Sequence, residues 1–338
     1  MSARPDEPLV RVENLDVTFR IKAAKVSAAR AVSFAIRKRE VVALVGESGS
    51  GKSTIGLSLL GLLAPDVATV SGSIRIVRKS GSSFEIVGAR DRHMLHVRGN
   101  DIAMIFQEPM SSLNPIYRIG TQIAESLRVH RRVSQRDALF EALRLLTLLG
   151  VPSPEKCLQS YPHQLSGGMR QRAMIAMALS GQPALLVADE PTTALDVTIQ
   201  AQIVDLLKSV QQDTAMAILF VTHDLGLVGE VASRVLVMYA GEIVEEGPVG
   251  QIMTRPRMPY TRALIASRPR LGGERRKINA IPGTVPDLTM LPAGCSFHPR
   301  CAFAVQGLCD RTAPALEEVA EGWHVRCHRW REIEEAGA

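Results

Sequence analysis

Residues 46–53 read Gly-Glu-Ser-Gly-Ser-Gly-Lys-Ser, and they constrain the fold more than any other stretch of the chain. They fit the pattern G-x-x-x-x-G-K-[ST] and stand between an apolar run, Val41–Val45, and a helical pattern over Thr54–Leu63. A buried strand, a glycine-rich turn and a helix in this order let backbone N–H groups point at phosphate oxygens, beside the positive end of the helix dipole. We therefore expect Lys52 to reach the β- and γ-phosphates of a nucleotide and the Ser53 hydroxyl to bind Mg²⁺. The predicted phosphate-binding residues are Gly46, Glu47, Ser48, Gly49, Ser50, Gly51, Lys52, Ser53 and Thr54.

Buried strands and helices alternate along the chain. Residues 9–19 and Val32–Ile36 alternate apolar and polar side chains, as half-buried strands do, whereas three runs are continuously apolar, as in a parallel sheet. These runs are Val41–Val45, Ala184–Ala188 and Ala217–Val221, and helical spacing marks Thr54–Leu63, Asp137–Leu149 and Ile199–Val210. The alternation predicts an α/β fold, with a helical insertion over residues 111–180 because that stretch shows no buried-strand pattern.

Composition narrows the functional classes. Of the 338 residues, 46% are hydrophobic and 22% charged, typical of an ordered globular protein. The net charge of +6 is mild, and only 4% of residues are aromatic, so stacking platforms for single-stranded nucleic acid are poorly supplied. Apolar runs are about as long as strands, and we do not expect the chain itself to cross a membrane.

Two carboxylates follow the apolar run Ala184–Ala188. Asp189 comes directly after this run and Glu190 is the next residue. The carboxyl end of a parallel strand is where open α/β sheets bind ligands, so both side chains are expected beside the phosphate loop. Asp189 is predicted to hold Mg²⁺, and Glu190 to orient or deprotonate a water molecule.

A second anion-binding feature lies in Leu165-Ser-Gly-Gly-Met-Arg-Gln-Arg172. Ser166, Gly167 and Gly168 precede a helical run, and a helix amino terminus attracts anions. A single nucleotide has one γ-phosphate, so either a second ligand binds or this feature faces a nucleotide held by another subunit.

In their order, these motifs resemble ABC-type ATPases, and most of all the ATP-binding subunits of oligopeptide/dipeptide ABC importers. The resemblance extends from about residue 9 to 330 and includes Gln107 in Ile105-Phe-Gln-Glu-Pro-Met-Ser-Ser-Leu-Asn-Pro115, Ala194-Leu-Asp196 and Thr222-His-Asp224. It also includes Pro259-Tyr-Thr261, Ile281-Pro-Gly283 and Gly294-Cys-Ser-Phe-His-Pro-Arg-Cys301.

The resemblance implies roles for individual residues. Two ATPase subunits, identical or homologous, would hold ATP head to tail, with each phosphate loop facing the partner's Ser166–Gly168 stretch. Gln107 would reach Mg²⁺ and the attacking water, His223 would contact the γ-phosphate, and Asp196 would lie across the dimer interface. Phe19 is the aromatic nearest the place where the family stacks adenine, although it equally fits a strand core. The family usually has Gly-Glu before the phosphate-loop strand, where this chain has Arg39-Glu40, a difference that we expect to alter only a turn.

Cys295, Cys301, Cys309 and Cys327 crowd the end of the chain, whereas Cys157 stands alone and is expected to be an inert buried thiol. Disulfides are disfavoured in the cytosol, and zinc sites usually contain a close C-x₂₋₄-C pair, which is missing here. Irregular spacing suits a [4Fe–4S] cluster, and the resemblance favours one. Zinc stays open because His298, His324 and His328 are interleaved, and free thiols stay open too.

The resemblance implies three parts. A nucleotide-binding core with an antiparallel β subdomain takes residues 1–110 and 181–260, a helical subdomain takes 111–180, and a cysteine-rich extension takes 261–338. A composition shift after Tyr260 and the basic, glycine-containing stretch Ser267–Lys277 indicate a linker into the extension.

The implied function is ATP hydrolysis coupled to uptake of peptides or related small solutes. The partners would be two integral membrane permease subunits, a second ATPase subunit and, indirectly, an extracytoplasmic solute-binding protein, with no nucleic acid. The chain would sit on the cytoplasmic face of the inner membrane. The alternative is a soluble ABC ATPase of DNA repair or translation.

Overall fold

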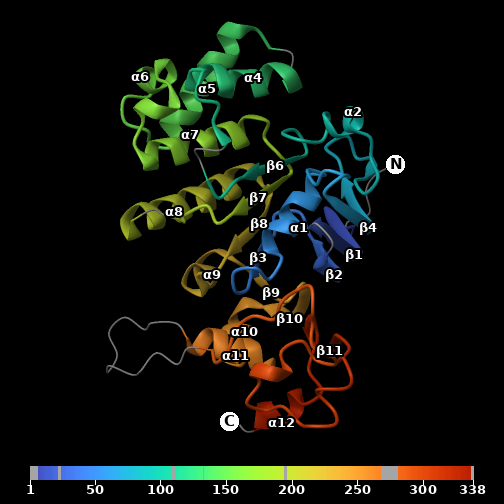
Figure 1. Ribbon diagram of the computed structural model, residues 1–338. Coiled ribbons are helices and arrows are strands. Elements are labelled where there is room, and N and C mark those ends of the chain that lie inside the picture. Colours follow the sequence, from blue (N-terminus) through green and yellow to red (C-terminus); the bar gives the residue numbers. More distant parts are fainter. Residues whose placement is uncertain are drawn as a thin grey trace.

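The structure is a computed structural model that describes residues 7–21, 24–108, 112–131, 133–193, 196–267 and 281–335. Its centre is an eight-stranded sheet in the order β11-β12-β10-β9-β3-β8-β7-β6 (Figure 1). Strands β6, β7, β8, β3 and β9 run parallel, which confirms the predicted α/β sheet. Their bounds are β6 Ile102–Ile105, β7 Leu185–Asp189, β8 Ala217–Thr222, β3 Val41–Val45 and β9 Arg234–Tyr239.

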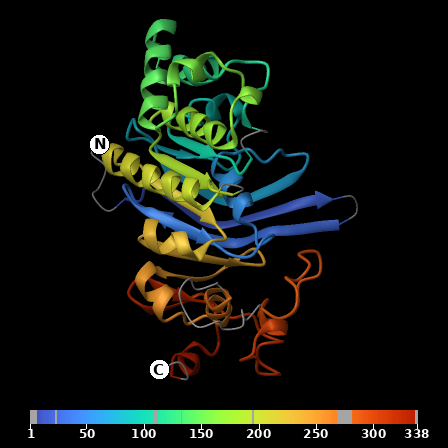
Figure 2. The ribbon, with the colours of Figure 1, turned by 90° about the vertical axis from the view of Figure 1, so that its left-hand side faces the viewer.

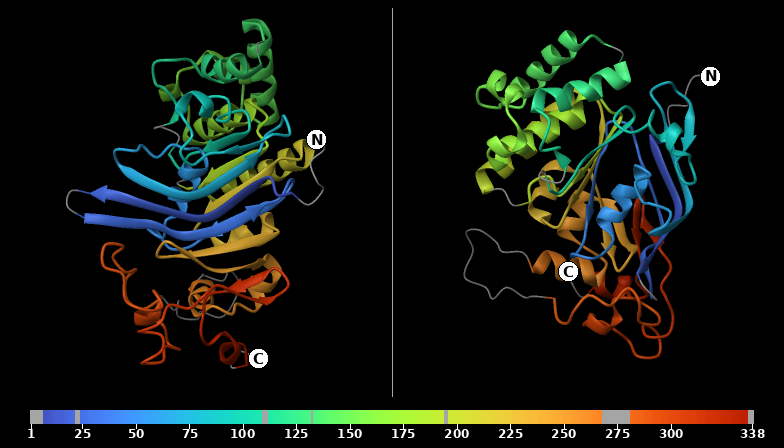
Figure 3. Two further views of the ribbon diagram at one scale, coloured as in Figure 1. Left: turned by 90° about the vertical axis from the view of Figure 1, so that its right-hand side faces the viewer. Right: turned by 45° about the horizontal axis from the view of Figure 1, so that its top comes forward.

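A second sheet is antiparallel and has the order β2-β1-β4-β5. It is built from β1 Val10–Ile21, β2 Ala24–Ile36, β4 Ala68–Val77 and β5 Ser83–Glu85. The long blue strands β1 and β2 cross the molecule in Figure 3. Helix α1, Lys52–Leu59, contacts β2 of this sheet and β7 of the central sheet. One hydrophobic core therefore joins both sheets through α1.

Helix α1 is shorter than the predicted stretch Thr54–Leu63. It begins two residues earlier, at Lys52, and gives way to a turn at Gly61, where φ is +58°. A left-handed glycine commonly ends a helix, and the apolar residues beyond it had extended the helical pattern.

Helices α4 to α7 form the upper layer in Figures 1 and 2. They are α4 Ile119–Arg131, α5 Gln135–Leu148, α6 Pro154–Gln159 and α7 Gly167–Ser180. Ser134 begins α5 by accepting a hydrogen bond from Asp137 N, and α5 matches the helix predicted over Asp137–Leu149. Helix α8, Val197–Thr214, extends the predicted Ile199–Val210 helix at both ends. A short helix, α2, covers Asp91–Met94.

The chain end packs at the opposite side of the molecule from helices α4–α7 (Figure 1). This tail follows α9 Leu225–Val231, β10 Glu242–Pro248 and α10 Val249–Thr254, and it comprises α11 Pro259–Ala266, η2 His298–Arg300, β11 Glu317–Ala320, β12 Trp323–Val325 and α12 Trp330–Glu335. Strand β12 pairs antiparallel with β10, so this tail continues the central sheet. Of the predicted linker Ser267–Lys277, only Ser267 lies within the described residues.

No helix in the described part of the chain combines the length and the apolar character that a membrane crossing requires.

Candidate nucleotide site

The phosphate loop is wedged between the end of β9 and strand β2. A Cβ atom on Gly46 would lie 2.2 Å from the carbonyl oxygen of Met238, and one on Gly51 would lie 2.1 Å from that of Ala28. Gly51 also has φ +104°, a left-handed conformation that favours glycine. The loop passes directly into α1, whose first turn has no side-chain cap. No side chain therefore occupies the N–H groups at the start of this helix, and they can bind an anion.

Lys52 is held inside the loop. Its Nζ donates to the carbonyl oxygens of Gly46, at 2.9 Å, and of Glu47, at 3.0 Å. Burial lowers the pKa of Lys52, although the nearby carboxylates of Glu190, Asp189 and Glu47 act in the opposite direction. The predicted phosphate-binding lysine therefore lies at the centre of the loop among three carboxylates.

Asp189 fits the predicted magnesium role. It is buried at the carboxyl end of β7, and its side chain is hydrogen-bonded to that of Ser53. Burial raises the pKa of Asp189, and the bond with Ser53 opposes this shift. One carboxylate oxygen, Oδ1, is buried without a hydrogen-bond partner among the described residues. An orphan oxygen beside a hydroxyl matches the oxygen ligands that Mg²⁺ takes.

The three predicted catalytic residues meet around Glu190. Gln107 Nε2 donates to Glu190 Oε2 at 3.0 Å, and His223 Nδ1 lies 3.1 Å from Glu190 Oε1. Thr193, which the sequence reasoning did not single out, donates its hydroxyl to Oε2 at 2.8 Å. Burial raises the pKa of Glu190, but the bonds from His223 and Thr193, with the charge of Lys52, outweigh burial and lower it overall. Glu190 also has φ +46°, a strained conformation of the kind that clusters at functional sites.

The Ser-Gly-Gly stretch lies on a different part of the chain. Ser166 begins α7, and its Oγ accepts from Met169 N at 3.4 Å. Nothing crowds the Cα of Gly167 and only the Ile199 side chain is near that of Gly168, so this helix start is open. Helix α7 packs on α4, α5 and β6, whereas α1 packs on β2 and β7.

Asp196 and Phe19 have structural contacts. The exposed Asp196 begins α8 by accepting from Ile199 N at 2.9 Å, and its neighbours Ala194 and Leu195 lie outside the described residues. Phe19 is half-buried against the core and pairs with Val26 across β1 and β2.

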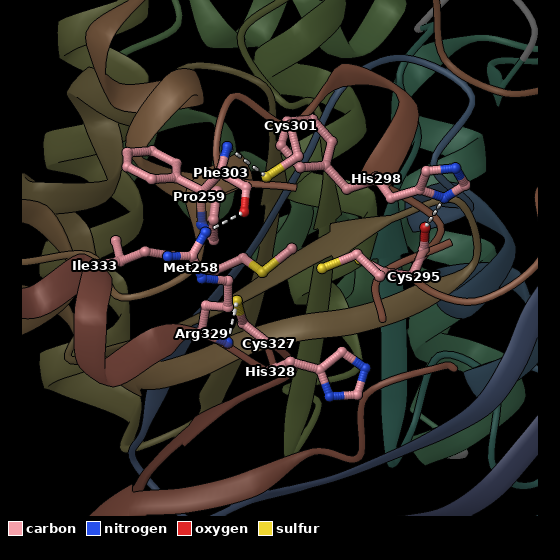
Figure 4. A pocket seen from close by; sticks show the side chains of 12 residues that line it. Met258, Pro259, Cys295, His298, Cys301, Phe303, Cys327, His328, Arg329 and Ile333 are labelled. Atoms are coloured by element: carbon pink, nitrogen blue, oxygen red, sulfur yellow. Dashed lines mark hydrogen bonds between the residues drawn. The ribbon is translucent and has the colours of Figure 1, made fainter. Parts of the chain in front are cut away.

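The four tail cysteines line one cavity. Figure 4 shows Cys295, Cys301 and Cys327 around it with Met258, and Cys309 completes the set. All five cysteines of the chain are free thiols. Burial raises the pKa of Cys295 to about 11 and that of Cys327 to about 12.

The cavity is not arranged around a single metal ion. Nowhere in the described ranges do three or more His, Cys, Asp or Glu side chains converge closely enough to hold one. His298 and His328 also line the cavity, but their ring nitrogens lie 3.0 Å and 2.9 Å from backbone carbonyl oxygens. Cys157 lies on the buried face of α6, in the core, where burial raises its pKa, as expected of an inert thiol.

Two residues outside the predicted set contact the phosphate loop. Glu47 N donates to the Tyr260 hydroxyl at 2.9 Å, and Arg300 forms an ion pair with the Glu47 carboxylate at 2.8 Å. Arg300 stands 253 positions from Glu47, so no local sequence pattern reveals the pair. Each residue nevertheless lies in a motif of the family resemblance, Glu47 in Gly46–Ser53 and Arg300 in Gly294–Cys301.

Three family models match the chain, among them one for an AAA domain over residues 159–229. Residues 29–193 match the family described as ABC transporter, and residues 244–309 match the oligopeptide/dipeptide transporter C-terminal region. The second match covers the tail segments that contain Tyr260, Cys295 and Arg300.

Proteins named for import are similar over most of the chain. A peptide import ATP-binding protein of Brucella abortus is 52% identical over 334 residues, which cover 97% of this chain and 98% of that protein. A peptide ABC transporter ATP-binding protein of Sinorhizobium fredii is 47% identical, with 96% of each chain covered. A glutathione import ATP-binding protein of Pectobacterium atrosepticum is 51% identical over 80% of this chain, which corresponds to 44% of that longer protein.

Solved structures agree with the fold. The ATP-binding cassette MJ0796, in a dimeric post-hydrolysis state with ADP and Pi, superimposes with a TM-score of 0.63 at 27% identity, covering 71% of this chain and 98% of that one. These similarities do not favour the DNA-repair or translation alternative. The chain belongs to the ABC transporter family, as an ATP-hydrolysing importer subunit of the oligopeptide/dipeptide type.

Proposed function

We propose that this chain hydrolyses ATP to drive uptake of peptides or related small solutes through two integral membrane permease subunits. The observation that supports the solute class is the similarity, along nearly the whole chain, to proteins named for peptide import. The tail match to the oligopeptide/dipeptide transporter region points the same way. The chain acts at the cytoplasmic face of the inner membrane, and an extracytoplasmic solute-binding protein delivers the solute.

Glu190 is the general base in this proposal. Its carboxylate is oriented by bonds to both oxygens, from Gln107 and Thr193 on one and His223 on the other. A lowered pKa keeps the carboxylate ionised at neutral pH, ready to accept a proton from the attacking water. His223 is more than half exposed, so it is available to contact the γ-phosphate.

Ser53 and Asp189 hold Mg²⁺ in this proposal, with Gln107 at its edge. The ion supplies charge neutralisation at the β- and γ-phosphates. Lys52 supplies a further positive charge from within the loop, and it moves from the carbonyl oxygens of Gly46 and Glu47 to the phosphates when ATP binds.

A second ATPase subunit completes the site. The open start of α7 and the phosphate loop lie on separate parts of one chain, so two chains placed head to tail bring Ser166, Gly167 and Gly168 of one to the nucleotide of the other. Asp196 lies at this interface. We also propose a division of the chain into a core of residues 1–110 and 181–260, a helical part over 111–180 and an extension over 261–338. Phe19 stacks on adenine: it lies on β1 beside the part of β2 whose Ala28 carbonyl abuts Gly51.

The tail cysteines bind a [4Fe–4S] cluster in this proposal. Four thiols from separate segments line one cavity, and thiolates are the ligands of such clusters. A cluster is larger than one ion, so its ligands would stand further apart than those of a single zinc ion. When bound, the cluster cross-links the segments that carry the cysteines.

A reconstituted complex tests the transport proposal. The chain, its permease subunits and its solute-binding protein are placed in liposomes, and uptake of labelled short peptides and of glutathione is followed with ATP inside. We expect ATP-dependent peptide uptake that Glu190→Gln abolishes. Uptake of neither solute, with normal ATPase activity, would contradict the solute class.

Metal analysis of the anaerobically purified chain tests the cluster. We expect a brown protein with broad absorption near 400 nm and about four irons per chain. Cys295→Ser should bleach the colour, whereas the matched variant Cys157→Ser, in a thiol far from the cavity, should keep it. One zinc and no iron would replace the cluster by a zinc site, and neither metal would leave free thiols.

A further inference from the structure

The phosphate loop is bound directly by the cysteine-rich tail through Arg300. Its guanidinium group forms a two-pronged ion pair with Glu47: Nη1 lies 2.8 Å from Oε2, and Nη2 lies 3.0 Å from Oε1. The Arg300 side chain is only 5% exposed, and its Nε donates to the carbonyl oxygen of Pro282 at 2.9 Å. Two-pronged charged pairs of this kind are strong and fix orientation.

An aromatic cluster holds the same part of the loop. The Tyr260 hydroxyl accepts from Glu47 N at 2.9 Å, and Arg300 Nη1 donates to the Tyr239 hydroxyl at 3.3 Å. The rings of Tyr239, Tyr260 and Phe297 pack with centroids 4.6–5.4 Å apart. Tyr260 and Phe297 belong to the tail, so Glu47 is anchored by the tail through both its backbone and its carboxylate.

Glu47 also connects to the phosphate-binding lysine. Its carbonyl oxygen accepts from Lys52 Nζ at 3.0 Å. The N–H, carboxylate and carbonyl of one loop residue are therefore bonded to Tyr260, Arg300 and Lys52, respectively. An unbroken chain of direct contacts runs from the tail to the lysine that binds the phosphates.

The charge of Glu47 makes this anchor necessary. A carboxylate on a loop that binds a polyphosphate repels the ligand unless a cation neutralises it. The Glu47 carboxylate also attracts the Lys52 ammonium group, and it therefore competes with the phosphates for this cation. Arg300 counteracts both the repulsion and the competition, because its guanidinium group donates a hydrogen bond to each carboxylate oxygen of Glu47.

We propose that Arg300 is a positioning residue for the phosphate loop, which holds Glu47 away from the triphosphate and thereby sets the affinity for ATP. Arg300 should affect ATP binding rather than the hydrolytic step. The hydrogen bonds described for Glu190 and His223 do not involve Arg300.

Steady-state ATPase kinetics of the full chain in its assembled complex test this. Arg300→Gln should raise the KM for ATP about tenfold and change kcat by less than about twofold, since losing the pair leaves an unpaired carboxylate on the loop. Glu47→Gln combined with Arg300→Gln should return KM to within about twofold of the wild-type value, since the repelling charge is gone. Fluorescent-nucleotide binding should follow the same order.

The control is Arg326→Gln. Arg326 also anchors the tail, through bonds from Nε to the carbonyl oxygen of Ile243 at 3.1 Å and from Nη1 to that of Pro314 at 3.2 Å, but neither acceptor is in the phosphate loop. The KM of Arg326→Gln for ATP should equal that of the wild type. A wild-type KM in Arg300→Gln would overturn the proposal. So would a double variant no better than the single one, or an equal rise in Arg326→Gln, since these outcomes would indicate general loosening of the tail.

Discussion

His223 Nδ1 lies 3.1 Å from Oε1 of Glu190, so the residues after β8 and β7 share one hydrogen bond. The other oxygen of the same carboxylate accepts from Gln107, which follows β6. Three neighbouring parallel strands thus end in side chains that meet at one carboxylate. The carboxyl edge of the sheet positions the catalytic group, as in other open α/β sheets.

Replacing Glu190 by Gln should stop turnover and leave nucleotide binding intact. The amide has nearly the same shape but cannot accept the proton, and loss of a general base lowers kcat by about 10²–10⁴-fold. ATP should then accumulate on the dimer, which size-exclusion chromatography and phosphate release measure together.

The matched control is Glu230→Gln, an exposed glutamate in α9. Its kcat should equal that of the wild type. Unchanged turnover in Glu190→Gln would remove this residue from the catalytic role, and lost nucleotide binding would assign it a structural one.

Lys52→Ala should abolish tight ATP binding. The substitution removes a cation from the centre of the loop, together with its bonds to the carbonyl oxygens of Gly46 and Glu47. We expect the Kd for ATP to rise by at least about 100-fold, because charged hydrogen bonds to phosphate each contribute about 1.5–3 kcal/mol. Isothermal calorimetry with the purified chain measures this, and near-normal ATPase activity in the complex would refute the phosphate-loop assignment.

Most of the central sheet was predictable, because its strands are buried on both faces and read as continuous apolar runs. Strand β7, for example, is entirely buried, and its apolar residues mark it in the sequence. The tail strand β12 was not predictable: its three residues, Trp323–Val325, are too few for a periodic pattern. Its pairing with β10 is set by tertiary contacts.

The site shows the same division. Lys52 and Asp189 follow from motifs whose chemistry is local to a strand and a turn. Arg300 does not, because its meaning depends on Glu47 far away in the sequence and close in space. An arginine between a proline and a cysteine has no pattern that points to a phosphate loop.

Arg39→Gly should stabilise the protein. Arg39 has φ +64° in the turn before β3, a left-handed conformation that favours glycine. The left-handed conformation costs a side-chain-bearing residue about 1–2 kcal/mol, whereas glycine loses about 0.4–1 kcal/mol through its more flexible unfolded state. We expect the free energy of unfolding to rise by up to about 1 kcal/mol, by urea denaturation, with ATPase activity unchanged. The neighbouring Lys38 is not among the residues with positive φ, so Lys38→Gly should lower stability, and a loss in Arg39→Gly of the same size would contradict the argument.

Glu245→Ala should detach the tail from the central sheet. This fully buried carboxylate accepts from Trp323 Nε1 at 3.1 Å and from the backbone N–H groups of Arg257 and Met258 at 2.8 and 3.3 Å. Alanine leaves these buried donors without an acceptor, at about 1–3 kcal/mol for each one that stays unsatisfied. Both tryptophans of the chain, Trp323 and Trp330, lie in the tail, so tryptophan fluorescence reports on this region alone.

In Glu245→Ala, we expect the urea unfolding midpoint reported by tryptophan fluorescence to fall well below the midpoint reported by far-ultraviolet circular dichroism, which follows the whole fold. Glu245→Gln, which keeps one acceptor oxygen, should separate the two midpoints less, and Glu321→Ala, at an exposed position before β12, should leave them coincident. Coincident midpoints in Glu245→Ala would mean that the tail and the sheet unfold as one unit, held together by contacts other than this carboxylate.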